Sequence, residues 1–289
     1  MFLLRPSQSK DLKDLHQLAT SLSARGFLTL PTDATELGEL ISLSENSFAE
    51  KLADPDEGEY LFVLEDREKK QLAGCSLIIA RHGTPVSPHI YFEVLDVQKA
   101  SPTLKKVFKH QILRLRLDAE GRTELGGLIV DPAYRNHPDK LGKHLSFIRF
   151  QYIHRHPDKF QDRLLVELLP PLTPDGKSLF WESLGRKFTG LDYQEADRLS
   201  RKEKGFITSL FPEGDFYTEF LSVEARGLIG QVGPETLPVA KMLQDLGFKY
   251  LKQIDPFDGG PHFGANREKV RMNLVLDFLK GSPIVMEID

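Results

Sequence analysis

Residues 126–150 have the residue types and the spacing that a phosphate-binding corner needs. They read as a strand that ends at Asp131-Pro132, then a polar loop, then a helix that begins near Gly142. The N-terminus of a helix presents unpaired backbone N–H groups to an anion, and a glycine lets that backbone approach closely. Three basic side chains flank the glycine: Arg135, Lys140 and Lys143. The segment indicates a pyrophosphate site such as coenzyme A requires, although a glycine that only starts a helix gives the same pattern.

Two glutamates lie inside apolar segments that are predicted to be strands. Glu124 belongs to TELGGLIV and Glu167 to RLLVELLP. Burial raises the pKa of a carboxylate toward the range in which it can accept a proton at neutral pH, so each is a candidate catalytic base. The alternative for both is a buried carboxylate held by backbone groups or by an arginine.

An acidic turn follows the last predicted strand. Asp255 and Asp258 stand next to a pair of glycines, 259–260, and could face a cationic substrate such as arginine or ornithine. A solvated loop that uses Asp and Gly for its turn geometry remains the alternative.

No metal site is expected from the sequence. His154 and His156 flank an arginine at the end of a predicted helix, where a positive charge suits the helix dipole, and no paired carboxylates or cysteines accompany them. Cys75 is the only cysteine, and it lies in the apolar run LAGCSLIIA, so it is interpreted as a core residue.

The elements that position these residues follow from hydrophobic spacing. In chain order the pattern predicts a strand at 2–5, a helix from Ser9, a turn over 25–33, a helix from near Asp33 to about Ala53, an antiparallel meander through 60–118, a strand over 123–131, a buried helix over 144–153, a strand over 163–170, mainly helices over 178–247, a strand from 248 and a last helix from 266. This order favours a mixed α/β (α+β) fold with a mainly antiparallel sheet flanked by helices. Two coupled parts are expected, residues 1–170 with the pyrophosphate corner and residues 171–289 with the acidic turn.

The composition excludes several classes of protein. With 289 residues, 40% of them hydrophobic and 28% charged, the chain is predicted to fold around a core rather than to be disordered. A net charge of -4 gives no general basic field, so nucleic acid is not an expected partner. The first residues are too short for a signal peptide and no apolar run could span a bilayer, so no membrane contact is expected and a cytoplasmic location is predicted.

Several phrases of the sequence, in order, resemble those of the arginine N-succinyltransferases. They are LLRPSQSKDL, GFLTLPTD, YLFVLED, TELGGLIVDPAYR, SLFWESLGRKF and FDGGP. The resemblance implies a GNAT-type acyltransferase fold, with two GNAT-like halves. It also implies transfer of the succinyl group of succinyl-CoA to the α-amine of arginine or ornithine, with the acyl-CoA as cosubstrate and no permanently bound cofactor. It leaves homo- and hetero-oligomers both open.

The resemblance also assigns roles to two positions. Leu128 corresponds to the coenzyme A contact on the strand after the Glu-Leu pair, and Gly233, in IGQVGP, stands where the family carries its catalytic histidine. Activity toward arginine is therefore expected to be weak unless Glu124 or Glu167 accepts the proton. Two alternatives follow: a different acyl-CoA N-acyltransferase, or a non-catalytic partner subunit that has lost its base.

Overall fold

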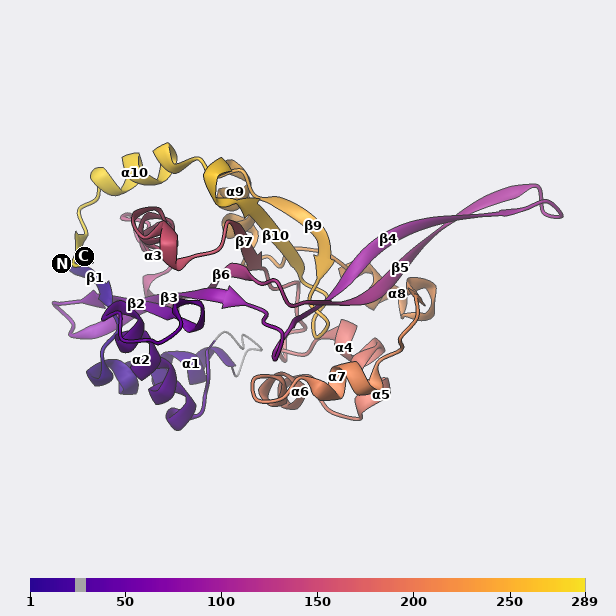
Figure 1. Cartoon of the computed structure of the whole chain (residues 1–289), viewed down its shortest axis with the longest axis horizontal. Coiled ribbons are helices and arrows are strands. Elements are labelled where there is room, and N and C mark those ends of the chain that lie inside the picture. The colour runs from indigo at the N-terminus through magenta and orange to yellow at the C-terminus, as the bar shows by residue number, and fades with distance from the viewer. Residues whose placement is uncertain (24–29, 289) are drawn as a thin grey trace.

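The computed structural model describes residues 1–23 and 30–288, and most of the predicted turn over 25–33 lies outside them. The described strands form one sheet in the order β11-β1-β2-β3-β6-β7-β10-β9-β4-β5-β8 (Figure 1). Their bounds are β1 Phe2–Pro6, β2 Glu59–Asp66, β3 Gln71–His82, β4 His89–Ser101, β5 Lys106–Asp118, β6 Arg122–Val130, β7 Arg163–Glu167, β8 Phe216–Tyr217, β9 Lys249–Ile254, β10 Pro261–Asn266 and β11 Val285–Met286.

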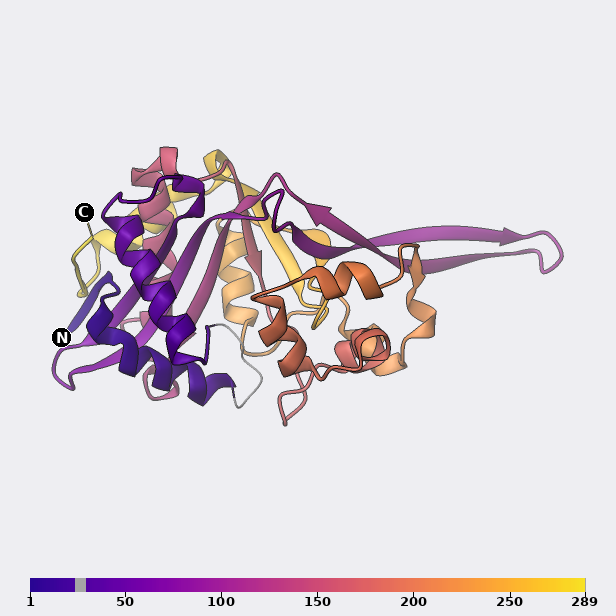
Figure 2. The ribbon, with the colours of Figure 1, turned by 60° about the horizontal axis from the view of Figure 1, so that its bottom comes forward.

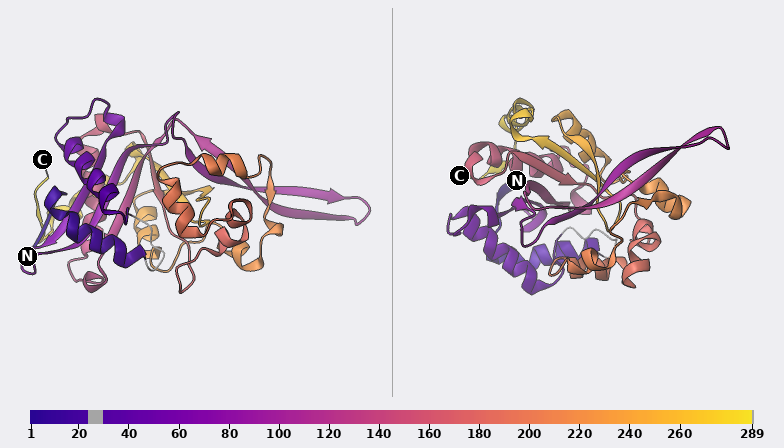
Figure 3. Two further views of the ribbon diagram at one scale, coloured as in Figure 1. Left: turned by 90° about the horizontal axis from the view of Figure 1, so that it is seen from below. Right: turned by 45° about the vertical axis from the view of Figure 1, so that its right-hand side comes forward.

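Helices cover both faces of this sheet. Their bounds are α1 Leu12–Ser23, α2 Ala34–Phe48, α3 Leu141–Arg155, α4 Leu179–Ser183, α5 Gly185–Thr189, α6 Tyr193–Ser200, α7 Gly205–Leu210, α8 Val223–Leu228, α9 Leu237–Asp245 and α10 Met272–Lys280. In Figure 1, α1 and α2 lie below the sheet, and α3, α9 and α10 lie above it. The short helices α4 to α8 gather beside the base of the β4–β5 hairpin, as Figure 2 and Figure 3 also show.

Three hydrophobic clusters match these three groups of helices. Alternate residues of β2 explain the division, because Phe62 packs with α3 on one face while Leu61 and Val63 pack with α1 and α2 on the other. The third cluster joins α4 to α8 with β4, β5 and β9 around Trp181. The predicted mixed sheet flanked by helices is thus confirmed.

Strand pairing differs from the predicted meander. The β2–β3 hairpin is confirmed, but β3 then pairs with β6, while β4 pairs with β5 and β9. The β4–β5 hairpin instead projects from the body as a long arm (Figure 1). Apolar alternation predicts where a strand lies and which face it buries, but the partner is chosen by contacts far away in sequence.

Several predicted elements end elsewhere or were missed. Asp33 caps α2 as expected, by accepting hydrogen bonds from two backbone N–H groups, but the helix ends at Phe48. The first of the helices predicted over 178–247 is divided at Leu184, and Phe188 is 38% exposed. The predicted last helix starts late, because β10 and a 3-10 turn precede α10.

The sheet runs through both predicted parts of the chain. The strand β10, from the second part, pairs antiparallel with β7, from the first. The boundary at residue 170 stays a prediction.

The pairing of β6 with β7 is short, and this shapes the site. The two parallel strands pair at Thr123↔Leu164 and Glu124↔Leu165, whereas β6 continues to Val130. On its other edge β6 has a bulge against β3, at Gly127, whose φ is 60°. After Glu124, the backbone of β6 is therefore not paired with β7 in the described part of the chain.

The bulge is held by a buried arginine. Arg149 on α3 donates from Nη1 to the carbonyl oxygen of Gly126 at 2.8 Å and from Nη2 to Oγ of Ser146 at 3.1 Å. Burial lowers the pKa of Arg149 to about 9. This contact fixes the middle of α3 against the bulged part of β6.

Candidate functional site

A cavity of about 980 Å³ lies between the end of β6, the start of α3 and the start of α9. All five residues that were predicted to bind coenzyme A line it: Leu128, Arg135, Lys140, Gly142 and Lys143. A cavity of this volume is at the upper end of the range for small-molecule sites. The five residues predicted from the 16-residue stretch 128–143 therefore line the same cavity.

The start of α3 has the geometry that an anion site needs. Lys140 precedes the helix with a left-handed backbone, φ 52°, and Gly142 is its second residue. A Cβ on Gly142 would lie 3.2 Å from Val130 Cγ2, so the glycine lets the helix approach the end of β6. The N–H of Lys143 donates to the carbonyl oxygen of Lys140 at 2.9 Å. The N–H groups of Leu141 and Gly142 have no partner within the helix, and both residues line the cavity.

Two of the cationic side chains at the cavity already have partners. Arg135 Nη1 lies 2.7 Å from Glu235 Oε2, and Lys143 Nζ lies over the ring of Phe278 at 4.4 Å from its centroid. The pKa of Lys143 is lowered, mainly by burial and to a smaller extent by the positive charge of Lys140. A phosphate would have to draw Arg135 away from Glu235, so the backbone of α3 is the better-prepared part of the corner.

Glu124, on β6, forms a hydrogen-bonded pair with a histidine that sequence reasoning missed. Its Oε2 lies 2.9 Å from Nδ1 of His82, at the end of β3. Burial alone would raise the pKa of Glu124, but the charge and hydrogen bond of His82 hold that pKa below its ordinary value. The expectation of a raised pKa is wrong here, because burial was the only influence that the sequence showed.

Glu167, at the end of β7, lies between two further histidines. Its Oε1 is 3.6 Å from Nδ1 of His89 and 3.6 Å from Nε2 of His262. Burial, and then the charges of Glu124 and Asp255, raise the pKa of Glu167 well above its ordinary value. The two glutamates thus sit in opposite electrostatic environments, which is an arrangement typical of acid–base sites.

The acidic turn is buried rather than solvated. Asp258 is 6% exposed, and its Oδ1 accepts from the N–H of Gly260, while Oδ1 of Asp255 accepts from the N–H groups of Phe257 and Asp258. Burial raises the pKa of Asp255 to about 6. Burial, and then the negative charge of Asp255, raise the pKa of Asp258 well above its ordinary value. A buried carboxylate beside a partly buried one is well suited to a cation.

Packing against the SLFWESLG segment explains this burial. The ring of Trp181 stacks on that of Phe257, with centroids 5.1 Å apart, and Ser178 Oγ donates to the carbonyl oxygen of Phe257. Gly259 has φ 77°, and a Cβ there would lie 3.1 Å from Phe180. The SLFWESLG and FDGGP segments therefore pack as one unit. Gly259 in the turn is explained by its backbone conformation and by its close contact with Phe180.

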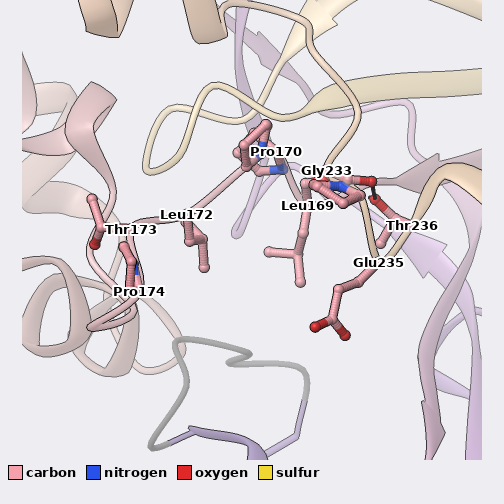
Figure 4. A pocket seen from close by; sticks show the side chains of 10 residues that line it. Leu169, Pro170, Leu172, Thr173, Pro174, Gly233, Glu235 and Thr236 are labelled. Atoms are coloured by element: carbon pink, nitrogen blue, oxygen red, sulfur yellow. Dashed lines mark hydrogen bonds between the residues drawn. The ribbon is translucent and has the colours of Figure 1, made fainter.

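Gly233 lies in a narrow place between backbone segments (Figure 4). Its N–H donates to the carbonyl oxygen of Leu169 at 2.8 Å, and a Cβ at this position would lie 2.7 Å from the carbonyl oxygen of Pro170. It lines a smaller cavity of about 280 Å³, which shares Leu169 and residues 234–236 with the large one. Gly233 is therefore hydrogen-bonded to Leu169, which lies two residues after Glu167, the last residue of β7.

The three histidines near Glu124 and Glu167 were not identified from the sequence. His82 and His89 lie on either side of the loop between β3 and β4, and their Nε2 and Nδ1 atoms are 2.8 Å apart. His262 follows the FDGGP phrase directly and is 0% exposed. That adjacency was the one signal in the sequence that would have drawn attention to a histidine.

Within residues 1–23 and 30–288, no helix has the length and apolarity needed to cross a membrane.

Comparisons with known proteins agree with one another. The family model described as "Arginine N-succinyltransferase beta subunit" matches residues 2–272. The arginine N-succinyltransferase of Yersinia enterocolitica is 36% identical over 290 residues, which cover 100% of this chain and 82% of that protein. That of Escherichia coli is 35% identical over 272 residues, 94% of this chain and 78% of the relative. Subunit AI of the arginine/ornithine succinyltransferase from Pseudomonas aeruginosa has a similar structure, with a TM-score of 0.80 and 32% identity over 94% of this chain and 78% of that one.

Proposed function

The chain belongs to the arginine N-succinyltransferase family, and from this membership we propose that it transfers the succinyl group of succinyl-CoA to the α-amine of arginine or ornithine. The observation that carries the proposal is β6, which has Glu124 in its first half and lines the large cavity with its last residues. One strand thus joins a site for the acyl donor to a group that can take a proton.

The acyl-CoA is proposed to bind along this strand. Its pyrophosphate would meet the backbone N–H groups at the start of α3, and Lys140 adds a positive charge there. Its pantetheine amides would pair with the backbone of β6 around Leu128, where β7 has diverged. The thioester then lies toward Glu124, and the α-amine attacks its carbonyl carbon, so that the N–C bond forms as the C–S bond breaks.

Glu124 is proposed as the group that accepts the amine's proton. An α-ammonium has an ordinary pKa of roughly 8 and must lose a proton before it can attack. Glu124 lies on the strand that would carry the donor, and His82 holds its carboxylate in place and in the ionised form that can accept a proton. Glu167 is the less suitable acceptor, since it lies between uncharged imidazoles and other carboxylates that favour its protonated form.

The amine's cationic side chain is proposed to bind at the acidic turn. Asp258 is buried and Asp255 is partly buried, and no cation pairs with Asp258 among the described residues within ion-pair distance. A guanidinium or a second ammonium would supply the missing charge.

Asp258→Asn is expected to weaken use of arginine selectively. The amide oxygen of Asn can still accept from the Gly260 N–H, so the turn is kept while the charge is lost. Hydrogen bonds to charged groups contribute about 1.5–3 kcal/mol, so kcat/KM for arginine should fall ~10–100-fold. A neutral amino acid is the comparison substrate. Equal use of both substrates by the wild type, with no effect of the substitution, would exclude the turn as the cation site.

Gly142→Asp is expected to weaken binding of coenzyme A. The new carboxylate would stand at the start of α3, where it repels the phosphates, and a charge pair a few Å apart near the surface is worth roughly 1–4 kcal/mol, or at least ~5-fold in Kd. Gly142→Asn is the control, because it has nearly the same shape without the charge. Titration calorimetry measures both, and an unchanged affinity in Gly142→Asp would show that the phosphates bind elsewhere.

The function itself is tested by identifying the product. Purified protein is incubated with succinyl-CoA and arginine, and mass spectrometry follows the mass gained by arginine. Succinylation at the α-amine is the expected result. Modification with acetyl-CoA in preference to succinyl-CoA would instead favour a different acyl-CoA N-acyltransferase.

A further inference from the structure

Three side chains beside Glu124 are spaced as the ligands of one metal ion are. The Nε2 atom of His82 and the Nδ1 atom of His89 are 2.8 Å apart, and Nδ1 of His89 is 3.6 Å from Oε1 of Glu167. One ligand atom from each of the three lies within 4.8 Å of the other two. We propose that His82, His89 and Glu167 bind a divalent transition-metal ion of the Zn²⁺ type.

The distances among the three side chains are close to those between the ligands of a tetrahedral ion. Metal–nitrogen and metal–oxygen bonds to Zn²⁺ of about 2.0–2.2 Å place two tetrahedral ligands roughly 3.3–3.5 Å apart. The 3.6 Å from His89 to Glu167 is close to this value, whereas the 2.8 Å from His89 to His82 is a hydrogen-bond distance that would lengthen by about 0.5 Å when an ion binds. At 3.6 Å, His89 and Glu167 are too far apart for a good hydrogen bond, but they are at the separation of two atoms that share an ion.

A carboxylate already orients the first of these ligands. Glu124 Oε2 lies 2.9 Å from Nδ1 of His82, so a neutral His82 donates from Nδ1 and presents the lone pair of Nε2 toward His89. A carboxylate that fixes the tautomer of a histidine in this way is the usual outer partner of a metal-binding imidazole.

The three proposed ligands lie on one sheet, beside buried ring nitrogens that have no hydrogen-bond partner among the described residues. The three ligands come from the ends of β3, β4 and β7, which belong to one sheet. Buried His89 Nε2 and both ring nitrogens of His262 have no hydrogen-bond partner among the described residues, and His262 is 3.6 Å from Glu167. A doubly charged ion would offset Glu124 and Glu167 together, which are otherwise two carboxylates with no Lys or Arg in ion-pair contact among the described residues.

The ion and the proposed acyl transfer would compete. An ion on His82 replaces the proton between the two imidazoles and engages Glu167, and it places its charge where the cationic amine must enter. Micromolar Zn²⁺ is therefore expected to inhibit transfer, and a chelator to restore it. Binding of the ion itself depends on neither the acyl donor nor the amine, so it can be measured whether or not the proposed function holds.

The test is titration of chelator-treated full-length protein with ZnCl₂ by calorimetry, and with CoCl₂ by visible absorption, which reports tetrahedral coordination. The expected result is one ion per chain. His89→Gln and Glu167→Gln should each weaken binding by at least the ~100-fold that even an outer partner can contribute. His110→Gln is the matched control, because His110 also pairs with a carboxylate, Glu219 at 2.8 Å, but stands apart from the cluster.

Circular dichroism checks that each variant is folded. If His89→Gln is not, the more exposed His82 takes its place as His82→Gln, with the same expected loss. Absence of a one-to-one Zn²⁺ or Co²⁺ complex in the wild type would overturn the proposal. So would a complex that survives in folded His89→Gln, or His82→Gln, and in Glu167→Gln with its affinity unchanged.

Discussion

Replacing Glu124 with Gln is expected to lower kcat for succinylation of arginine ~10²–10⁴-fold, which is the usual contribution of a general base. Gln keeps the shape of the side chain and can still contact His82 Nδ1, but it cannot accept the amine's proton. The affinity for coenzyme A should be unchanged, since the proposed phosphate corner lies at the other end of β6. Steady-state rates together with titration calorimetry measure the two quantities separately.

Glu167→Gln serves as the comparison. It should cost less, because the surroundings of Glu167 favour its protonated form, which Gln resembles. If Glu167→Gln abolished transfer while Glu124→Gln left it intact, the two glutamates would have to exchange the roles proposed for them. A rise in the optimum pH of Glu124→Gln would indicate that an unassisted free amine has become the nucleophile.

Replacing Gly233 with His is expected to lower both stability and activity. From the sequence alone, restoring the family's histidine would be the natural way to rescue a decayed site. A Cβ at this position, however, would lie 2.7 Å from the carbonyl oxygen of Pro170 and 2.9 Å from that of Leu169. Overpacking of this kind costs about 1–3 kcal/mol, and the segments that must shift lie directly after Glu167.

Gly233→Ala separates the backbone clash from the chemistry of the imidazole. Both variants carry the Cβ, so thermal unfolding should show a lower Tm in each, and kcat/KM should fall in both. An increase in kcat/KM for Gly233→His, with a decrease for Gly233→Ala, would contradict this account and support a site that only lacks its histidine.

Much of the fold was predictable because it depends on local patterns. The strand, loop and helix over 126–150 follow from apolar spacing and one glycine, and its five candidate contacts do line a single cavity. The motif phrases indicated the family, and this is confirmed by the relatives and by the shared structure of the Pseudomonas aeruginosa subunit.

The rest depends on contacts between distant segments. The histidines that surround the two glutamates come from β3, β4 and β10, and His262 is 173 residues after His89, so no local pattern joins them. The choice of β6 rather than β4 as the partner of β3 is likewise non-local. The burial of Asp258 is set by Trp181 and Phe180, which pack from another segment.

The most direct test of the proposed function is a thiol-release assay on the metal-free wild type and on Glu124→Gln. Succinyl-CoA and acetyl-CoA are each paired with arginine, ornithine and a neutral amino acid. The account predicts release of coenzyme A by the wild type that depends on succinyl-CoA and a cationic amine, and its near-complete loss in Glu124→Gln. No release by the folded wild type with any pair, despite binding of coenzyme A, would contradict it and identify the chain as a subunit that binds the coenzyme without catalysing transfer.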